Sequence, residues 1–203
     1  MIGWPYDQSD PGIMLWRAAI EGWQMPVRRH QRILELGCCE SDWLERMHAW
    51  EPSLTLIGVD VRMSEPTPGT QRLIGDARNG LLLVPESYDW VVMLGALEHF
   101  GLGFYGDPVD ADGDIHTMQN VVRWLKPGGS VYFDVPCNPE ASVNHHFRTY
   151  APADIAARLL VPGLREVARG YSLPEPQAGT WIPEPTERRT PYHYVAMWAT
   201  KDS

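Results

Sequence analysis

The sequence predicts an α/β protein in which helices cover both faces of a mostly parallel β-sheet. Five short, nearly all-apolar runs recur along the chain, and most are separated by segments with helical periodicity. Strands that are apolar on both faces are typical of parallel sheets, whose right-handed crossovers place helices on either side. With 203 residues and 44% apolar side chains, the chain is large enough for one domain with a full core.

We therefore expect residues 1–203 to form a single domain that begins with a helical cap over residues 1–30. Asp10 and Pro11 are a typical helix start, because Asp10 supplies an N-cap side chain and Pro11 a ring suited to the first helical position. Apolar residues at helical spacing follow until Pro26, which ends the predicted helix.

The first predicted strand covers residues 32–37, and the helix after it starts with a capping-box spacing from Asp42 to Glu45. The crossover at residues 61–71 contains two prolines and a glycine, so we expect no helix there. The other parallel strands are predicted at residues 54–60, 72–76, 89–94 and 130–135.

Two later helices are predicted, one over residues 114–126 with Asp114 as its N-cap and one that begins at Pro152. The C-terminal part is predicted as two antiparallel strands, at residues 164–173 and 192–200, joined by a proline-rich loop at residues 174–191. The last strand should therefore run antiparallel to the rest of the sheet.

Composition excludes several classes of function. Acidic residues outnumber basic ones 26 to 17, and the basic residues are scattered, so we expect no nucleic-acid partner. The longest apolar run, residues 90–97, is too short to span a bilayer, and the chain start lacks a secretion signal; we expect no membrane association and a cytoplasmic location. Cys38, Cys39 and Cys137 are an odd set that fits reduced thiols.

Polar residues follow the predicted strands at the point where each strand ends. Glu35 and Gly37 end the first strand, Asp60 ends the second and Asp76 ends the third. Ligands of open parallel sheets bind at these carboxyl ends, and an acid roughly twenty residues after the first glycine reads ribose hydroxyls. Asp60 stands near that distance, which predicts a nucleoside site; the alternative is that these carboxylates only cap turns.

The first turn indicates which nucleoside fits. Glu40 and Asp42 would repel a pyrophosphate, and Gly37 is the one fingerprint glycine present, which disfavours a dinucleotide oxidoreductase. A positively charged cofactor without phosphate fits the turn better.

At this point the sequence resembles the class I S-adenosylmethionine-dependent methyltransferases that act on small molecules. The motifs run in that family's order over about residues 32–165, with Cys39 and Ser41 where the family usually has glycines. They are ILELGCCES, LIGVD, LIGDA, YDWVVMLGALEH, VVRWLKPGGSVYFDVP and HHFRTYAPADIAARLLVPGL. The resemblance implies a Rossmann-like three-layer sandwich with a seven-stranded sheet whose last strand is antiparallel.

The resemblance also implies S-adenosylmethionine as cofactor. Glu35 and Gly37 would face its methionine moiety, Asp60 its ribose, and Asp76 with Ala77 its adenine. The implied cofactor-binding residues are Glu35, Gly37, Cys38, Cys39, Asp60, Asp76, Ala77, Leu94 and Gly95.

Three histidines are the candidate catalytic residues. His99 follows the fourth strand in the loop that faces the methyl group in the family, and histidine titrates near neutral pH, which suits a general base. The alternative is that His99 only holds its loop. His145 and His146 follow the fifth strand, where one is expected to contact substrate and the other to cap the helix at Pro152.

The acidic loop from Asp107 to Asp114 lacks the glycine and glutamate of an EF-hand, so we expect turn and cap roles and no metal. Trp4, Tyr6, Phe104, Tyr105 and Trp181 lie in segments that can fold over the crevice, as an acceptor pocket or simply as packing.

Methyl transfer to a small molecule, such as a sugar or secondary metabolite, is therefore the function that the sequence favours. The alternative from another class is a non-catalytic binding or scaffold protein that kept the fold. The sequence predicts a small-molecule partner and does not predict the oligomeric state.

Overall fold

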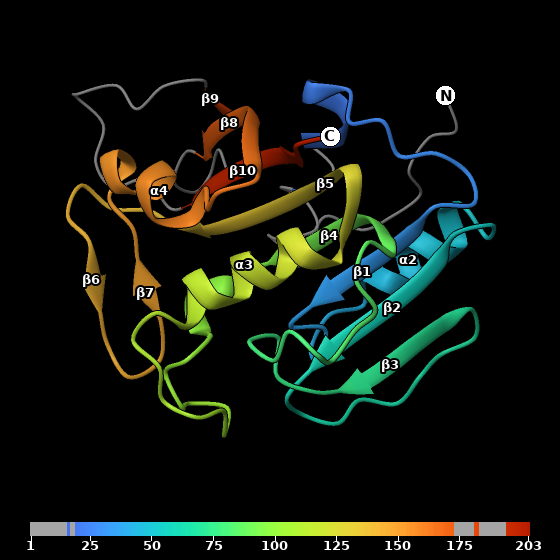
Figure 1. Cartoon of the computed structure of the whole chain (residues 1–203), viewed down its shortest axis with the longest axis horizontal. Coiled ribbons are helices and arrows are strands. Elements are labelled where there is room, and N and C mark those ends of the chain that lie inside the picture. The colour runs from blue at the N-terminus through green and yellow to red at the C-terminus, as the bar shows by residue number, and fades with distance from the viewer. Residues whose placement is uncertain (1–15, 17–18, 173–180, 183–193) are drawn as a thin grey trace.

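The computed structural model describes residue 16 and residues 19–172, 181–182 and 194–203. Its main sheet has the strand order β3-β2-β1-β4-β5-β10-β8-β9 (Figure 1). The strands are β1 (Arg32–Leu36), β2 (Thr55–Asp60), β3 (Thr70–Ile74), β4 (Tyr88–Leu94), β5 (Leu125–Pro136), β8 (Leu164–Ser172), β9 (Trp181–Ile182) and β10 (Tyr194–Lys201).

The first five strands pair in parallel, and β10 lies antiparallel between β5 and β8. The predicted mostly parallel seven-stranded sheet with an antiparallel last strand is therefore confirmed. The two-residue β9 adds an eighth, very short strand beside β8.

Helices cover both faces of the sheet, as predicted. On one face lie α3 (Gly113–Trp124) and α4 (Pro152–Leu159), and on the other lies α2 (Trp43–Trp50) with the helical residues 19–23. A 3₁₀ turn, η1 (Leu97–His99), follows β4, and a hairpin of β6 (Ser142–Val143) and β7 (Arg148–Thr149) stands apart from the main sheet (Figure 1). The predicted helix start at Asp10 and Pro11 lies outside the described residues.

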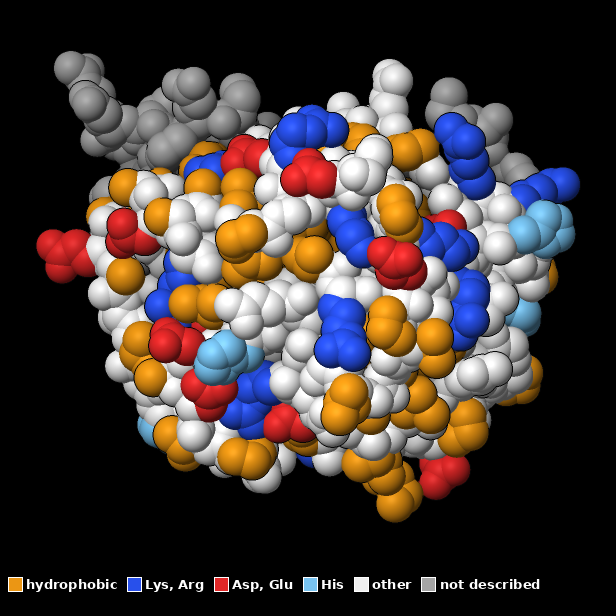
Figure 2. Space-filling view, in the orientation of Figure 1, with side chains coloured by type: hydrophobic (Ala, Val, Ile, Leu, Met, Phe, Trp, Pro, Cys, Tyr) orange, Lys and Arg blue, Asp and Glu red, His pale blue; other side chains and the backbone are white. Residues whose placement is uncertain are grey.

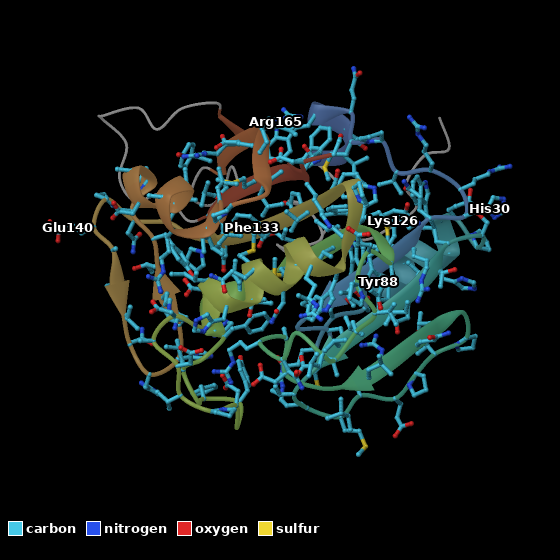
Figure 3. The ribbon with its side chains drawn as sticks, viewed as in Figure 1. His30, Tyr88, Lys126, Phe133, Glu140 and Arg165 are labelled. Carbon is cyan, nitrogen blue, oxygen red and sulfur yellow. The ribbon has the colours of Figure 1, made fainter. Side chains whose placement is uncertain are left out.

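Two apolar cores hold these layers together. On the α2 side, the Trp16 ring makes edge contacts with Trp43 at 5.2 Å and Tyr132 at 4.9 Å between ring centroids. On the α3 side, Trp124 packs in the cluster that contains Phe133 of β5, which Figure 3 shows inside the molecule. Because alternate residues of one strand point to opposite faces, Tyr132 and Phe133 join the two cores.

The predicted capping box at the start of α2 is wrong. Asp42 occupies the N-cap position but makes no capping hydrogen bond; its carboxylate accepts from Arg46 Nε at 2.8 Å. The Trp43 N–H donates instead to Ser41 Oγ at 3.1 Å. Glu45 points instead to Arg72 of β3 and to Thr67 in the crossover before it, and both bind its carboxylate. These tertiary partners outcompete the local one.

Asp114 is also not the N-cap of α3, which is Asp112. It lies in the first turn and is fully buried, accepting hydrogen bonds from Tyr150 Oη at 2.9 Å and Arg158 Nε at 2.7 Å. A buried carboxylate with an arginine partner joins α3 to α4, which helical spacing alone could not reveal.

Two strand boundaries differ from the prediction. β5 begins at Leu125 instead of Ser130, because the Pro-Gly-Gly turn is absorbed as an irregularity opposite Tyr88 and Trp90. β3 ends at Ile74, so Asp76 lies beyond the strand on the following loop. The crossover before β3 contains no helix, as expected.

On the face shown in Figure 2, basic and acidic side chains are interspersed. Within the described part of the chain, no helix has the length and apolar character needed to cross a membrane.

Candidate functional site

A cavity of about 300 Å³ opens at the carboxyl ends of the parallel strands. Its wall includes residues that follow β1, β2, β3 and β4, together with Asp134 of β5 and Tyr194 of β10. The predicted residues that line it are Gly37, Asp60, Asp76, Ala77, Leu94, Gly95 and His99. The strand order makes the cavity a trough, with Asp60 and Asp76 at one end and Asp134 and Tyr194 at the other.

The first turn approaches the cavity closely because Gly37 has no side chain. Its φ is +81°, and a Cβ on it would lie 2.5 Å from the Cβ of Ala96 at the start of η1. Only glycine combines this backbone conformation with this space.

Asp60 connects the end of β2 to the first turn. Its Oδ2 accepts the Cys39 N–H at 3.0 Å, and its Oδ1 accepts the backbone N–H and Nε of Arg62 at 2.9 and 3.2 Å. The Arg62 guanidinium then donates to Glu40 at 2.7 Å and lies over the Tyr105 ring at 4.1 Å. Arg62 therefore links three loops along the cavity wall.

Asp76 is held by an arginine in the same local geometry. Its Oδ1 accepts the backbone N–H and Nε of Arg78, both at 2.9 Å, and its Oδ2 accepts a guanidinium nitrogen at 2.5 Å. Burial acts to raise the pKa of Asp76, but the hydrogen bonds of Arg78 hold this pKa below its usual value.

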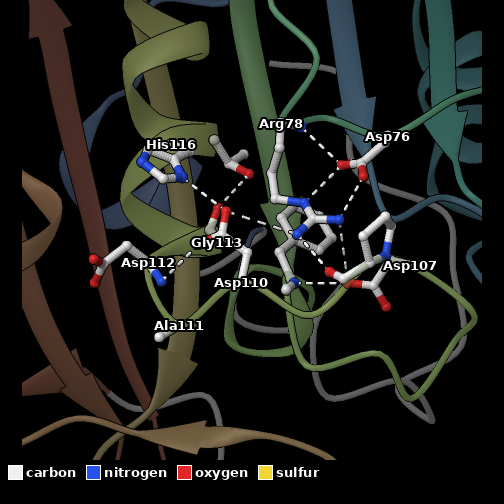
Figure 4. Close-up of polar contacts among 12 residues, drawn as sticks. Asp76, Arg78, Asp107, Asp110, Ala111, Asp112, Gly113 and His116 are labelled. Carbon is white, nitrogen blue, oxygen red and sulfur yellow. Dashed lines mark hydrogen bonds and ion pairs between the residues drawn. The ribbon is translucent and has the colours of Figure 1, made fainter.

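Arg78 extends to the acidic loop that follows β4, as Figure 4 shows. It donates to the Pro108 carbonyl at 2.6 Å and lies within 4 Å of the carboxylates of Asp107 and Asp110. Asp110 in turn accepts from His116 of α3 at 2.7 Å. Across the described residues, no three His, Cys, Asp or Glu side chains gather as a metal site would require.

Glu35 and Cys38 lie behind the cavity wall. Burial raises the pKa of Glu35 to about 8 and that of the Cys38 thiol to about 12. Arg72 of β3 supports the turn from the same side, donating to the carbonyls of Cys38 at 2.6 Å and Ser41 at 3.3 Å. Cys39 faces Met63, with its Sγ 3.5 Å from that carbonyl oxygen, and it reaches Asp60 only through its backbone.

His99 presents one nitrogen toward the far end of the trough. Its Nδ1 lies 2.7 Å from the His146 carbonyl oxygen, which can only accept, so Nδ1 carries the proton. The neutral ring therefore has its lone pair on Nε2. Burial lowers the pKa of His99, which keeps this nitrogen unprotonated at neutral pH.

His145 and His146 do not line the cavity. The His146 ring packs on Phe104, with centroids 4.0 Å apart, and its Nε2 lies 3.3 Å from Tyr105 Oη. His145 is exposed and touches only the Phe104 ring among the described ring contacts. Neither caps α4, whose N-cap is Ala151. Trp4, Tyr6 and the side chain of Trp181 lie outside the described residues.

Sequence reasoning missed the arginines around the cavity. Arg62 and Arg78 each stand two residues after a predicted site carboxylate, and this D-x-R pattern was a usable signal. Arg72 carried no such signal, because the residues that it contacts on the first turn and α2 are distant from it in the sequence.

Comparison with known proteins gives one family model and many solved structures of one fold. The family described as "Caenorhabditis protein of unknown function, DUF268" matches residues 79–178, and its description assigns no activity. No curated protein matches the sequence.

Solved structures match over nearly the whole chain at low identity. The Burkholderia thailandensis 1,6-didemethyltoxoflavin-N1-methyltransferase, solved with S-adenosylhomocysteine, is 16% identical with a TM-score of 0.67 over 96% of this chain and 80% of that one. The Haemonchus contortus phosphoethanolamine N-methyltransferase 2, solved with S-adenosyl-L-methionine, is 14% identical with a TM-score of 0.67. That match covers 93% of this chain and 52% of that one.

The [4+2]-cyclase SpnF matches with a TM-score of 0.68 at 13% identity, over 100% of this chain and 87% of that one. These identities establish architecture, and the architecture agrees with the sheet order and the position of the cavity. The chain has the class I S-adenosylmethionine-dependent methyltransferase fold.

Proposed function

We propose that the protein transfers a methyl group from S-adenosylmethionine to a small molecule. The observation that carries this proposal is the trough itself, which runs from two carboxylates at the ends of β2 and β3 to the unprotonated Nε2 of His99. A nucleoside end and a base end in one cavity are what the reaction needs.

The cavity wall fits this cofactor better than a dinucleotide. The lining has five acids, Glu40, Asp60, Asp76, Asp107 and Asp134, against one arginine, Arg62, and this excess of negative charge attracts a sulfonium and repels a pyrophosphate. Asp60 Oδ2 has one lone pair left after binding the Cys39 N–H, and that lone pair is available to a ribose hydroxyl. Asp76 and Ala77 would border the adenine, and the backbone of Leu94 and Gly95 would border the centre of the cofactor.

The first turn would hold the methionine moiety at Gly37. Since Glu35 and Cys38 are behind the wall, we assign them to support of the turn. Cys39 contributes its backbone N–H to the orientation of Asp60.

His99 is the proposed general base. When bound, the cofactor supplies an electrophilic methyl group, and the wall must align the acceptor with it; such alignment is worth roughly 7 to 11 kcal/mol. His99 Nε2 accepts the proton that the acceptor loses, while the His146 carbonyl fixes the ring orientation. His146 is then a positioning residue. His145, which is exposed, is left as a candidate for contact with substrate at the rim.

A non-catalytic binding role is the second candidate, and one observation favours it. Both site carboxylates are already engaged by arginines, and Arg62 lies along the wall. In such a protein the trough would be held in a form that admits no cofactor.

Calorimetric titration with S-adenosylhomocysteine separates the two functions. Saturable binding that Asp60→Ala weakens, and that the exposed control Asp202→Ala leaves unchanged, supports the methyltransferase. Absence of binding to the folded wild-type protein supports the second candidate and removes the first.

A further inference from the structure

A loop that follows β4, residues 100–112, crosses the carboxyl edge of the sheet; we call it the crossing loop. It reaches two arginines on the other side, because Tyr105 lies under the guanidinium of Arg62 after β2 and Pro108 accepts from Arg78 after β3. In the strand order β3-β2-β1-β4, β1 separates β4 from both of these strands. The crossing loop therefore passes over the end of β1, and its Tyr105 lines the cavity together with Arg62.

The base of the crossing loop is firmly held. The Gly101 N–H donates to the Asp107 carboxylate at 2.7 Å, and the Gly101 carbonyl accepts the Asp110 N–H at 2.8 Å. The Arg78 side chain, which is 9% exposed, lies against both carboxylates, as Figure 4 shows. Contacts that are both numerous and nearly buried keep this part of the loop in place.

The tip of the crossing loop is held only by its side chains. Phe104 and Tyr105 stand between Gly103 and Gly106, whose φ angles are +76° and +89°. Among the described residues, the backbones of Phe104 and Tyr105 make no hydrogen bond. Glycine on both sides gives the chain the conformational freedom of a hinge. The tip can therefore move while the base stays fixed.

The tip is joined to the opposite wall of the cavity by a three-residue bridge, Glu40–Arg62–Tyr105. The Arg62 guanidinium lies 4.1 Å from the centre of the Tyr105 ring and donates to Glu40 of the first turn at 2.7 Å. The Glu40 side chain is 75% exposed and that of Arg62 is 28% exposed. Exposed ion pairs and exposed cation–π contacts are each weak. The bridge spans the cavity and costs little to break.

We infer, on the basis of the proposed methyltransferase function, that the Glu40–Arg62–Tyr105 bridge is the gate through which the cofactor enters and leaves. The gate opens when the tip of the crossing loop swings away and the Tyr105 ring leaves the Arg62 guanidinium. Asp60 keeps its hold on Arg62 Nε in both states. Closure over the bound cofactor excludes water from the cavity, as methyl transfer requires.

The position of the bridge assigns the gate to the cofactor and not to the acceptor. Glu40 belongs to the first turn and Arg62 follows β2, and these are the segments proposed to hold the methionine moiety and the ribose. The proposed base, His99, follows β4 on the other side of β1. An acceptor that enters beside His99 does not have to pass the bridge.

The test measures the association and dissociation rates of S-adenosylhomocysteine by surface plasmon resonance on the immobilised protein. The fraction of open protein limits both rates when the gate closes over the empty and the filled cavity alike. Arg62→Ala should raise both rates by roughly five- to thirtyfold, the range for losing one cation–π contact and one exposed ion pair. The dissociation constant should change by less than about threefold, because the two rates rise together.

Further variants separate the two contacts of the bridge. Tyr105→Leu removes the ring and Glu40→Gln removes the ion pair, so each should raise both rates by less than Arg62→Ala does. Tyr105→Phe keeps the ring face and should behave as the wild-type protein. Arg32→Ala is the matched control, because the Arg32 guanidinium lies 5.2 Å from the Tyr88 ring at the amino ends of β1 and β4, away from the cavity.

Unchanged rates in Arg62→Ala and Tyr105→Leu would overturn the inference, and so would a Tyr105→Phe variant as fast as Tyr105→Leu. A rise in the dissociation rate alone would also overturn it, since Arg62 would then contact the cofactor directly. If Arg62→Ala fails to fold, Tyr105→Leu and Glu40→Gln still test the bridge. Failure of the wild-type protein and of every variant to bind S-adenosylhomocysteine is a different outcome, and it removes the proposed function itself.

Discussion

The turns after β2 and β3 share one sequence pattern and serve different purposes. In each, an aspartate accepts the backbone N–H and Nε of the arginine two residues later, as Asp60 does from Arg62 and Asp76 from Arg78. The Arg78 side chain is 9% exposed and binds the acidic loop, whereas the Arg62 side chain is 28% exposed and reaches Glu40 and Tyr105. The local D-x-R pattern thus determines the contact between each aspartate and its arginine. The loop that packs over each arginine determines the arginine's other contacts.

A third carboxyl at the same sheet edge has no such arginine. Glu35 ends β1, and the residue two positions later is Gly37, which must be glycine for the turn to approach Ala96. Glu35 is consequently buried without a bound guanidinium, and its pKa rises to about 8. At the three strand ends, Asp76 is therefore bound by a nearly buried arginine and Asp60 by a partly exposed one, whereas burial raises the pKa of Glu35.

The largest expected effect is a loss of turnover when the His99 end of the trough is changed. His99→Ala should reduce turnover by roughly 10²- to 10⁴-fold, the usual effect of losing a positioned proton acceptor. Cofactor affinity should change little, because His99 is remote from Asp60 and Asp76 in the strand order. Release of S-adenosylhomocysteine in the presence of an active acceptor measures turnover. If affinity and turnover fall together, His99 only organises its loop.

Arg78→Ala should destabilise the fold by about 3 kcal/mol, the low end of the range for breaking a buried ion pair, because it leaves the buried Asp107 and the partly exposed Asp76 without their guanidinium. Urea denaturation followed by circular dichroism measures this loss. An effect as small as that of Arg62→Ala would show that burial does not distinguish the two turns.

Asp60→Ala should weaken S-adenosylhomocysteine binding by about 1.5 to 3 kcal/mol, as expected for lost charge-assisted hydrogen bonds. Calorimetry on the folded variant provides the measurement. Unchanged affinity would remove Asp60 from the cofactor site and make both turns purely structural.

Glu35 predicts a pH dependence opposite in sign to that of Asp76. Because the pKa of Glu35 is raised from 4.5 to about 8, the folded state holds a proton that the unfolded state loses, so stability falls as pH rises between these values. Asp76, whose pKa is lowered, contributes stability above its unfolded pKa and loses it as pH falls through its folded pKa.

The Glu35 slope approaches about 1.4 kcal/mol per pH unit. Denaturation from pH 5 to 8 should show it in the wild-type protein, and Glu35→Gln should flatten it. An identical slope in the variant would assign the pH dependence to other groups.

Arg62→Ala should have the smallest effect, a loss of no more than about 1 kcal/mol of stability, because partly exposed ion pairs contribute little. Cofactor affinity should stay equal or improve, since Asp60 Oδ1 is released from the guanidinium. A marked loss of affinity would mean that Arg62 itself contacts the cofactor.

Some parts of this molecule could be predicted from local pattern and some could not. The glycine at position 37 and the carboxylates at positions 60 and 76 were recognisable because strand ends of a parallel sheet share one edge. The caps expected at Asp42 and Asp114 failed because Arg46 and Arg158 offered those side chains charged partners. The N-cap rule weighs only backbone donors, and a charged side chain outcompetes them, whether it lies one turn along the same helix as Arg46 does or on another helix as Arg158 does.

The sequence by itself determined the sheet, its parallel order and the edge where the site lies, because apolar periodicity and turn residues act over a few neighbouring positions. Only the tertiary structure decided which carboxyl groups bind an arginine from another loop and which are buried beside other acids. Arg78 meets Asp107, and Glu98 meets His99 and Asp134, through loops brought together by the strand order. The burial of each carboxyl group and its distance from other charged groups set its charge, and both depend on the fold because they involve residues that are far apart in the sequence.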